Sequence, residues 1–394
     1  MTRSVSKPSV VLFSTADWTT GYWTNKQHNE AALARRGYRV LYVEAIGLRR
    51  PRLSDRRDLG RLFRRLIRGV RSLFGPARVA DRIWVLSPLT LPLAHRQPLV
   101  RSLNGALLRF ALSVSIRALR LEGAQVWTYH PYVLEALRGL PLGRLSYHSV
   151  DDLSAVPGVD ADAILGAEVE LLGQCHSVFV TGRLLEDRCR AHNSNVHFFT
   201  NVADADHFGQ AISAPEPADV AAIPRPRLGY HGVLSDSKLD CVLLVTLMRD
   251  HPHWQLMLIG DEREGQDPAS FAGLRRLANV HFLGPRPYAD LPPYLGAMDV
   301  GLIPLAKNAY TAAMYPMKLY EFLAAGVPVV SMEAPYLRDA PASVEMARDA
   351  DEFADAIERQ LMRGRLTPHE ARDAVGDHTW DARLDRMLAI TEAP

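Results

Sequence analysis

Short, wholly apolar segments alternate along this chain with longer segments in which apolar residues recur at helical spacing. Strands that are apolar on both faces are typical of parallel sheets covered by helices on each side. The alternation therefore predicts an α/β protein, with one set of strands in each half of the chain. The expected strands lie at residues 9–13, 39–43, 83–87, 125–129, 145–149, 177–181, 228–231, 254–259, 280–283, 300–303 and 327–331.

Between residues 208 and 226 the composition changes to Ala, Pro, Glu and Asp. Such a composition is typical of a linker. The length of 394 residues also exceeds one ordinary core, because single domains usually hold about 100–200 residues. We therefore expect two Rossmann-like domains, 1–207 and 227–375, joined by a proline-rich linker over 208–226.

Composition narrows the classes of function. The formal net charge is only +2, so the chain as a whole is not attracted to nucleic acid. Cys175, Cys189 and Cys241 are far apart and show neither disulfide nor metal-ligand spacing. We therefore expect a reduced cytoplasmic compartment and no metal ion or other cofactor. The first apolar run, 10–13, has the length of a strand rather than a secretory leader, and no run approaches a membrane span of about 20 residues.

The segment 299–331 carries the clearest chemical signal. Its pattern predicts a buried strand, a loop, a helix over 317–325 that Pro316 introduces and Gly326 ends, and a second buried strand. The free N–H groups and partial positive charge at the start of such a helix favour phosphate. The segment therefore predicts an anion site at the beginning of this helix.

Lys318 stands in the first turn of this helix and Glu321 follows three residues later, so both side chains lie on one face. Only five of the 46 basic residues are lysines, which sets Lys318 apart. An ammonium group suits a diphosphate, and a carboxylate suits a ribose diol because it accepts from two hydroxyls. The alternative is an ordinary surface ion pair. We expect a nucleotide here.

Two common nucleotide motifs are absent from the sequence. No G-x-G-x-x-G follows a strand in either half, which removes support for a dinucleotide site. No G-x-x-x-x-G-K-S/T occurs either, which removes P-loop chemistry. Both absences favour a nucleotide-sugar site over a nicotinamide or ATP site.

The Lys-x-x-Glu helix, the preceding Asp-Val-Gly-Leu-Ile-Pro and the following Ala-Ala-Gly-Val-Pro-Val-Val resemble the donor site of GT-B glycosyltransferases. The closer likeness is to bacterial, GT4-like transferases of the teichuronic-acid and xanthan glucuronosyltransferase kind. Residues 17–18, 151–158 and 281–286 extend the resemblance over most of the chain. It implies the GT-B fold: two Rossmann-like domains with parallel sheets facing a cleft. The first would bind acceptor, the second would bind donor, and a last helix within 376–394 would cross back.

The sequence departs from the family at one position. Ala313 stands eight residues before Glu321, where retaining members carry the first acid of a Glu-x7-Glu pair. We therefore expect inversion, which needs a base for the acceptor hydroxyl. Asp151 and Asp152 follow the strand 145–149, where open α/β sheets place ligands. Neighbouring side chains diverge, so one acid is expected in the cleft and the other as a cap. We choose Asp152 as the base.

Further donor-side candidates lie in two loops. Gly229-Tyr-His-Gly232 follows a strand, and glycine there lets backbone approach a ligand. In GT-B enzymes the loop 284–290 faces the nucleotide base, which is either uracil or guanine here. Arg286 suits a phosphate or a sugar, or else lies on the surface. The donor-side candidates are Lys318, Glu321, Met317, Tyr320, Gly232, His231, Arg286 and Gly284.

A polar and aromatic loop over 15–28 follows the first strand. Its rings can stack on sugar faces and its polar groups can meet hydroxyls or phosphate. The alternative is packing within the domain. The acceptor-side candidates are Trp18, Trp23, Lys26 and His28.

Residues 48–82 hold twelve arginines, with apolar residues at helical spacing among them. The pattern predicts a basic amphipathic helix around 59–74 that binds anionic lipid headgroups. Alternatively, its apolar face packs on the protein's own sheet. We expect peripheral attachment to the inner face of the cytoplasmic membrane.

These patterns together predict a glycosyltransferase, specifically a hexosyltransferase. It would move sugar from a nucleotide sugar, a UDP-sugar or GDP-mannose, to a polysaccharide or lipid-linked acceptor during bacterial cell-surface polysaccharide synthesis. A nucleotide-sugar 2-epimerase can use the same two-domain architecture, although it needs neither the amphipathic helix nor the aromatic loop. A non-catalytic GT-B scaffold is a third reading, against which the intact Lys318 and Glu321 argue.

Overall fold

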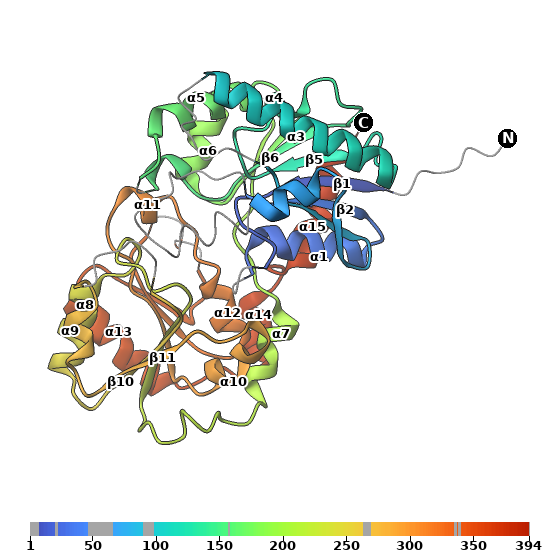
Figure 1. Ribbon diagram of the computed structural model, residues 1–394. Coiled ribbons are helices and arrows are strands. Elements are labelled where there is room, and N and C mark those ends of the chain that lie inside the picture. Colours follow the sequence, from blue (N-terminus) through green and yellow to red (C-terminus); the bar gives the residue numbers. More distant parts are fainter. Residues whose placement is uncertain are drawn as a thin grey trace. The chain divides into compact units, whose positions relative to one another are not determined.

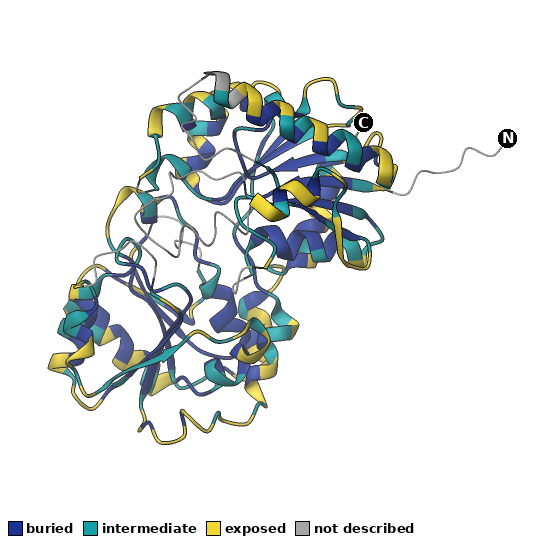
Figure 2. Ribbon diagram, viewed as in Figure 1, coloured by how far each residue is buried: buried dark blue, intermediate teal, exposed yellow. Residues whose placement is uncertain are grey.

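The computed structural model describes residues 8–19, 23–45, 66–89, 98–156, 158–262, 269–334, 337 and 340–393. The chain divides into two compact units (Figure 1). The first unit comprises Met1–Phe199 with Leu384–Pro394, and the second comprises Thr200–Arg383. Each unit has its own sheet and its own buried core, as Figure 2 shows.

The sheet of the first unit has the strand order β3-β4-β2-β1-β5-β6-β7-β8. Every described pairing is parallel except the antiparallel pairing of β3 with β4. The central strands are almost wholly buried, which explains their continuous apolar sequences. The strands are β1 (Ser9–Phe13), β2 (Arg39–Val43), β3 (Ala77–Ala80), β4 (Ile83–Leu86), β5 (Gln125–Thr128), β6 (Leu145–Ser149), β7 (Ser177–Val180) and β8 (Val196–Phe198).

Helices cover both faces of this sheet (Figure 1). Leu384, Met387 and Leu388 of the last helix pack in the core of this unit beside Trp127. The helical elements are α1 (Asn25–Arg35), α3 (Pro98–Leu119), α4 (Leu134–Leu137), α5 (Ala161–Leu172), α6 (Arg183–Arg190), α15 (Trp380–Thr391) and the short 3-10 turn η1 (Leu153–Ala155). Residues 66–72 are also helical.

The sheet of the second unit has the order β11-β10-β9-β12-β13-β14, and its pairings are parallel. This is the order of a doubly wound dinucleotide-type sheet, in which the winding direction reverses between the two central strands. The strands are β9 (Arg227–His231), β10 (Gln255–Ile259), β11 (Val280–Gly284), β12 (Val300–Ile303), β13 (Val329–Met332) and β14 (Val344–Ala347).

Figure 1 shows α8, α9 and α13 on one side of this second sheet and α7, α10, α12 and α14 on the other. Gly326 ends α12 with a φ of +73°. The N–H groups of Gly326 and Val327 donate to Leu323 and Phe322, the two bonds of a Schellman motif. The helical elements are α7 (Ala205–Gly209), η2 (Gln210–Ile212), α8 (Cys241–Asp250), α9 (Ala272–Arg275), η3 (Tyr288–Asp290), α10 (Leu291–Gly296), α11 (Ala309–Ala312), α12 (Lys318–Ala324), α13 (Ala350–Arg363) and α14 (Pro368–Val375).

The predicted α/β architecture is confirmed, and the eleven expected strands coincide with observed strands to within two residues at either end. The sequence did not predict β3, β8 or β14. These three are short, lie at sheet edges and contain polar residues, so they lack the apolar run of a central strand.

The proline-rich segment 208–226 belongs to the second unit. Phe208, Val220 and Ile223 are buried in the core of that unit. Its composition resembles a linker because Pro and Ala are frequent, but its few large apolar residues are spaced to anchor it.

Arg365 joins several helix ends of the second unit. Its guanidinium donates to the carbonyls of Gly296 (2.7 Å), Met298 (2.6 Å) and Ala325 (2.7 Å). These carbonyls lie at or just beyond the end of α10 or α12, where helical partners are lacking. Arg365 therefore fastens α10 and α12 together.

We expect Arg365→Met to destabilise the protein by about 2–4 kcal/mol, because three carbonyls lose their donors in a poorly solvated place. Urea unfolding followed by circular dichroism measures this. Arg249→Met is the matched control, since Arg249 is exposed and bonds its sequence neighbour Asp250. Equal unfolding midpoints for both variants would contradict the role given to Arg365.

Candidate active site

The reversal of winding in the second unit lies between β9 and β12, where ligands of open α/β sheets bind beyond the carboxyl ends of the strands. His231 is the last residue of β9 and Gly232 follows it. Helix α12 comes after β12 and brings Lys318 and Glu321 to the same place. The structure thus brings together four of the predicted donor-side residues.

Lys318 lies directly against the backbone of Gly232. Gly232 has a φ of +115°, and a Cβ atom built on it would come within 2.8 Å of the Lys318 Nζ. The ammonium also lies 5.2 Å from the centre of the Tyr230 ring. Within the described part of the chain, Lys318 has no ion pair and no hydrogen bond. A partly buried ammonium with its donors uncommitted is suited to an anionic ligand.

Glu321 faces His231 across the same site. The distance between His231 Nε2 and Glu321 Oε2 is 3.3 Å, and the two side chains are 5% and 9% exposed. Burial raises the pKa of Glu321 to about 7, although Lys318 opposes this shift. Burial and the Lys318 charge hold the pKa of His231 well below its usual range. Burial also lowers the pKa of Lys318, which Glu321 partly offsets.

Aromatic rings enclose this pair. The Phe322 ring meets His231 edge to face at 5.0 Å, and Tyr288 stacks on His207 at 4.3 Å. Burial and the Glu321 charge raise the pKa of Tyr288, so Tyr288 belongs to the surroundings of Glu321. The sequence reasoning missed His207 and Tyr288. The sequence held one indication of Tyr288, as an aromatic residue at the end of the loop after β11, and none that singled out His207.

Arg286 and Tyr320, two predicted donor contacts, are engaged elsewhere. Arg286 pairs with Asp219 at 2.6 Å and donates to the Tyr294 hydroxyl at 2.7 Å. Tyr320 is buried, stacks on His378 at 4.2 Å and lies 3.1 Å from the Tyr315 hydroxyl. The polar groups of both residues therefore have protein partners in this structure, and a contact of either residue with the donor stays a prediction.

The other two donor-side candidates, Met317 and Gly284, are notable for their backbone positions rather than for a reactive side chain. Met317 is half-buried and precedes α12 as its N-cap. Gly284 ends β11 with a φ of +72° at the edge of the sheet. The geometry of the described residues assigns neither residue a specific contact with a ligand.

The first unit has its own reversal of winding, between β1 and β5. Lys26 of α1 lies 3.9 Å from Asp151, which follows β6, and 5.3 Å from the centre of the Tyr129 ring, which follows β5. Asn29, one helical turn after Lys26, donates to the Tyr129 hydroxyl at 2.6 Å. The structure therefore groups Lys26, Asn29, Tyr129 and Asp151; the sequence reasoning missed Asn29 and Tyr129.

Asp152, our first choice of base, is fully engaged. It caps η1 by accepting from the Ser154 N–H and hydroxyl, and it pairs with Arg188 at 3.1 Å. Burial alone would raise the pKa of Asp152, but the bonds from Ser154 and Arg188 hold it below its usual value. A carboxylate stabilised in this way is a poor proton acceptor. The structure therefore moves our choice of base from Asp152 to Asp151.

The remaining acceptor-side candidates form one aromatic cluster. Trp18 lies 5.4 Å from Tyr42 and 6.0 Å from Trp23, and Trp23 lies 5.3 Å from His28. His28 is buried, whereas both tryptophans are partly exposed. Only the tryptophan rings therefore present a surface on which a sugar can stack.

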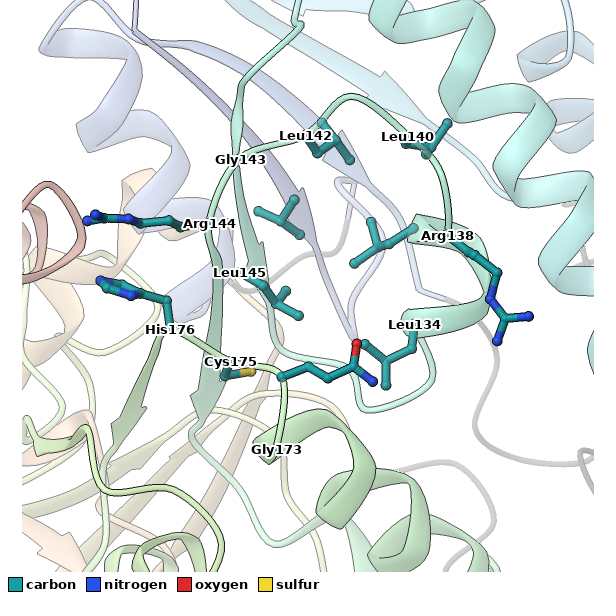
Figure 3. A pocket seen from close by; sticks show the side chains of 13 residues that line it. Leu134, Arg138, Leu140, Leu142, Gly143, Arg144, Leu145, Gly173, Cys175 and His176 are labelled. Carbon is teal, nitrogen blue, oxygen red and sulfur yellow. The ribbon is translucent and has the colours of Figure 1, made fainter. Parts of the chain in front are cut away.

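A cavity of about 520 Å³ lies elsewhere in the first unit. It adjoins Leu145, the first residue of β6, and Cys175 and His176, which precede β7. It therefore lies by the amino ends of these strands, opposite the edge that carries Asp151. Figure 3 shows leucine side chains gathered in it, while Arg138 and Arg144 point away on opposite sides. We assign no catalytic part to it.

Comparison with known proteins identifies the second unit. Residues 225–363 match the family Glyco_trans_1_4, described as glycosyl transferases group 1. The chain carries a group 1 glycosyltransferase domain. This domain contains every residue of the Lys318 and Glu321 site named above except His207.

One curated relative of this chain is the Bacillus subtilis (strain 168) teichuronic acid biosynthesis glycosyltransferase TuaH, 29% identical over 176 residues. The match spans 44% of each chain, so it covers less than half of that relative.

Solved structures extend the likeness over the whole chain. Sucrose-phosphate synthase from Thermosynechococcus elongatus has a TM-score of 0.70 at 16% identity, covering 98% of both chains. Anabaena HepE in complex with UDP and glucose has a TM-score of 0.66 at 16% identity, covering 97% of this chain and 98% of its own. Trehalose-6-phosphate synthase OtsA has a TM-score of 0.65 at 13% identity, covering 98% and 100%. These likenesses establish the GT-B fold.

Proposed function

We propose that this protein transfers a sugar from a nucleotide-sugar donor to a polysaccharide or lipid-linked acceptor in the synthesis of a cell-surface polysaccharide. The observation that carries the proposal is the uncommitted Lys318 ammonium, held against Gly232 one helical turn from Glu321. A cation beside close backbone suits a diphosphate, and the neighbouring carboxylate suits the ribose diol.

The comparisons support this class of reaction. The relative named for teichuronic acid synthesis favours a cell-envelope polymer as the acceptor. The complexes of HepE with UDP and UDP-glucose favour uridine over guanosine in the donor. The test is incubation of the purified protein with a panel of nucleotide sugars, with and without a lipid acceptor extract. Sugar hydrolysis or epimerisation without transfer would contradict the proposal.

We expect Lys318→Ala and Glu321→Ala each to weaken nucleotide binding by about 1.5–3 kcal/mol, because each removes a charge-assisted contact. Calorimetry with UDP measures the affinity. Lys307→Ala is the matched control: Lys307 lies in the loop between β12 and α11, is exposed and donates to the Arg348 carbonyl. Full affinity in both folded site variants would end the assignment of the donor site.

In the proposed reaction, Asp151 takes the proton from the acceptor hydroxyl, and the anomeric configuration is inverted. Asp151 suits this part because its side chain is about one-third exposed (34%) and its contact with Lys26, at 3.9 Å, is looser than the 3.1 Å pairing of Asp152 with Arg188. Trp18 and Trp23, in the same unit, offer rings on which a sugar can stack.

We expect Asp151→Asn to lower turnover by about 10²–10⁴-fold while leaving donor affinity unchanged. Asp152→Asn is the control. It loses the ion pair with Arg188, so it should lower the melting temperature while the turnover of the folded enzyme changes little. NMR of the product reads the anomeric configuration. A retained configuration, or a larger loss of turnover for Asp152→Asn, would remove Asp151 from this part.

We further propose that the basic segment around 59–74 attaches the protein to anionic membrane. Residues 59–65 lie outside the described part of the chain. In the helical remainder and the turn after it, Leu66, Val70 and Phe74 are 50%, 44% and 85% exposed. An apolar stripe left in solvent beside arginines is typical of interfacial helices. In the described parts of the chain, no helix is long and apolar enough to cross a bilayer.

We expect the wild-type protein to float with anionic liposomes, and added salt to weaken this without abolishing it. Leu66→Ser, Val70→Ser and Phe74→Ser together should release the protein with an unchanged melting temperature, because all three side chains are exposed. The matched control changes Val242, Met346 and Met362, exposed residues of the second unit, to Ser. Wild-type protein that stays unbound at low salt would leave only a soluble acceptor.

A further inference from the structure

The Glu321 carboxylate has a fixed companion. His231 reaches it from the end of β9 at 3.3 Å, and both side chains are more than nine-tenths buried. The His231 ring is itself held by Phe322 at 5.0 Å and by Phe208 at 6.2 Å. The position of the imidazole is therefore set by packing, before any ligand binds.

The protons of this pair allow two neutral-imidazole states. When Glu321 is ionised, His231 Nε2–H can donate to it, and the other carboxylate oxygen remains free to accept from a diol. When Glu321 is protonated, its own O–H can donate to His231 Nε2, and the imidazole proton then sits on Nδ1. The second state holds one more proton, and it leaves fewer acceptor sites for a diol.

The groups that face this pair decide which state prevails. Lys318 lies on the helix of Glu321, Tyr230 lies beside His231 on β9, and Tyr288 comes from η3. Burial raises the pKa of Glu321 to about 7 against the pull of Lys318. His231 remains neutral because burial and Lys318 both lower its pKa. Both tyrosines remain neutral because burial raises their pKa.

We propose that His231 is a positioning residue of the donor site. Its buried Nε2 has no hydrogen-bond partner among the described residues and lies 3.3 Å from Glu321 Oε2, close enough to donate to the carboxylate once a small rotation aligns the two groups, which favours the ionised form of Glu321. The site then takes nucleotides with a free ribose diol, and only while Glu321 is ionised. This inference rests on the proposed function, since it takes Glu321 as the partner of the ribose.

The sign of the pH effect follows from the proton count. Ligand binds the state with one proton fewer, so affinity is full at high pH and is lost as the pH falls through about 7. Between about pH 8.5 and pH 5.5 the affinity should fall by about 30-fold, in proportion to the ionised fraction of Glu321.

The experiment is calorimetry on the full chain over this pH range with UDP-glucose and GDP-mannose. Their diphosphates are diesters that stay ionised throughout, so the protein alone titrates. The wild type should show the fall in affinity with a midpoint near pH 7. The 2′,3′-dideoxy analogue of the bound nucleotide sugar should bind more weakly and independently of pH, a test that needs no variant.

Two variants separate positioning from packing. His231→Phe keeps an aromatic ring but removes the N–H donor, so the midpoint should rise. His231→Gln keeps an N–H donor, so the midpoint should stay near that of the wild type. Glu321→Gln should bind weakly with no pH dependence. A purely structural role for His231 would instead lower the affinity equally at every pH.

The outcomes are distinguishable from one another. If neither nucleotide sugar binds the wild type at any pH, the proposed function itself fails. If one binds with a flat pH profile, or if the dideoxy analogue titrates like the parent, this inference is overturned while the donor site stands. An unchanged midpoint in folded His231→Phe would likewise overturn the part given to His231.

Discussion

The site in the second unit depends on two side chains of opposite charge on the short helix α12. Both are largely shielded from solvent, yet they do not form an ion pair with each other. Lys318 and Glu321 lie on one face of α12, yet no ion pair between them is formed, and the acid faces His231 instead. Uncompensated charges of this kind destabilise a fold. They persist here because the surrounding structure, with Gly232 beneath the ammonium and the Schellman turn behind the helix, fixes the position of α12. Under the proposed function, a ligand that supplies the complementary groups would regain this free energy.

In the first unit, by contrast, the charged side chains around Arg188 pair with one another. Arg188 pairs with both Asp152 and Glu168 at 3.1 Å, and Glu168 also accepts from the Tyr147 hydroxyl. This network satisfies the buried acids and ties the turn after β6 to α5 and α6. Asp151, one residue away, stays outside it. A network of paired charges therefore holds the backbone that carries Asp151, the acid that we propose as the base.

The sequence was sufficient for the central strands and for the placement of Lys318 and Glu321 on one helix, because both depend on local patterns. Wholly apolar runs marked the buried strands, and the i,i+3 spacing placed Lys318 and Glu321 on one helix face. The edge strands were missed because their pairing is set by a neighbour rather than by their own composition. The orientation of the Asp152 side chain depends on its ion pair with Arg188 of α6. This contact joins residues far apart in the sequence, so no local pattern predicts it. The pairing of Arg286 with Asp219 was missed for the same reason, since Asp219 comes from the proline-rich segment.

The two units share one topological feature but differ in the residues that surround it. In each, the winding reverses between two central strands, and polar side chains gather beyond their carboxyl ends. In the second unit the loop after β9 is short and glycine-containing, so a cation can lie against backbone and the site suits phosphate. In the first unit the loop after β1 is aromatic and α1 begins with polar residues, so the same edge presents rings, an amide and a carboxylate. Fold topology thus fixes where chemistry occurs, whereas the first residues after each central strand decide which chemistry it is.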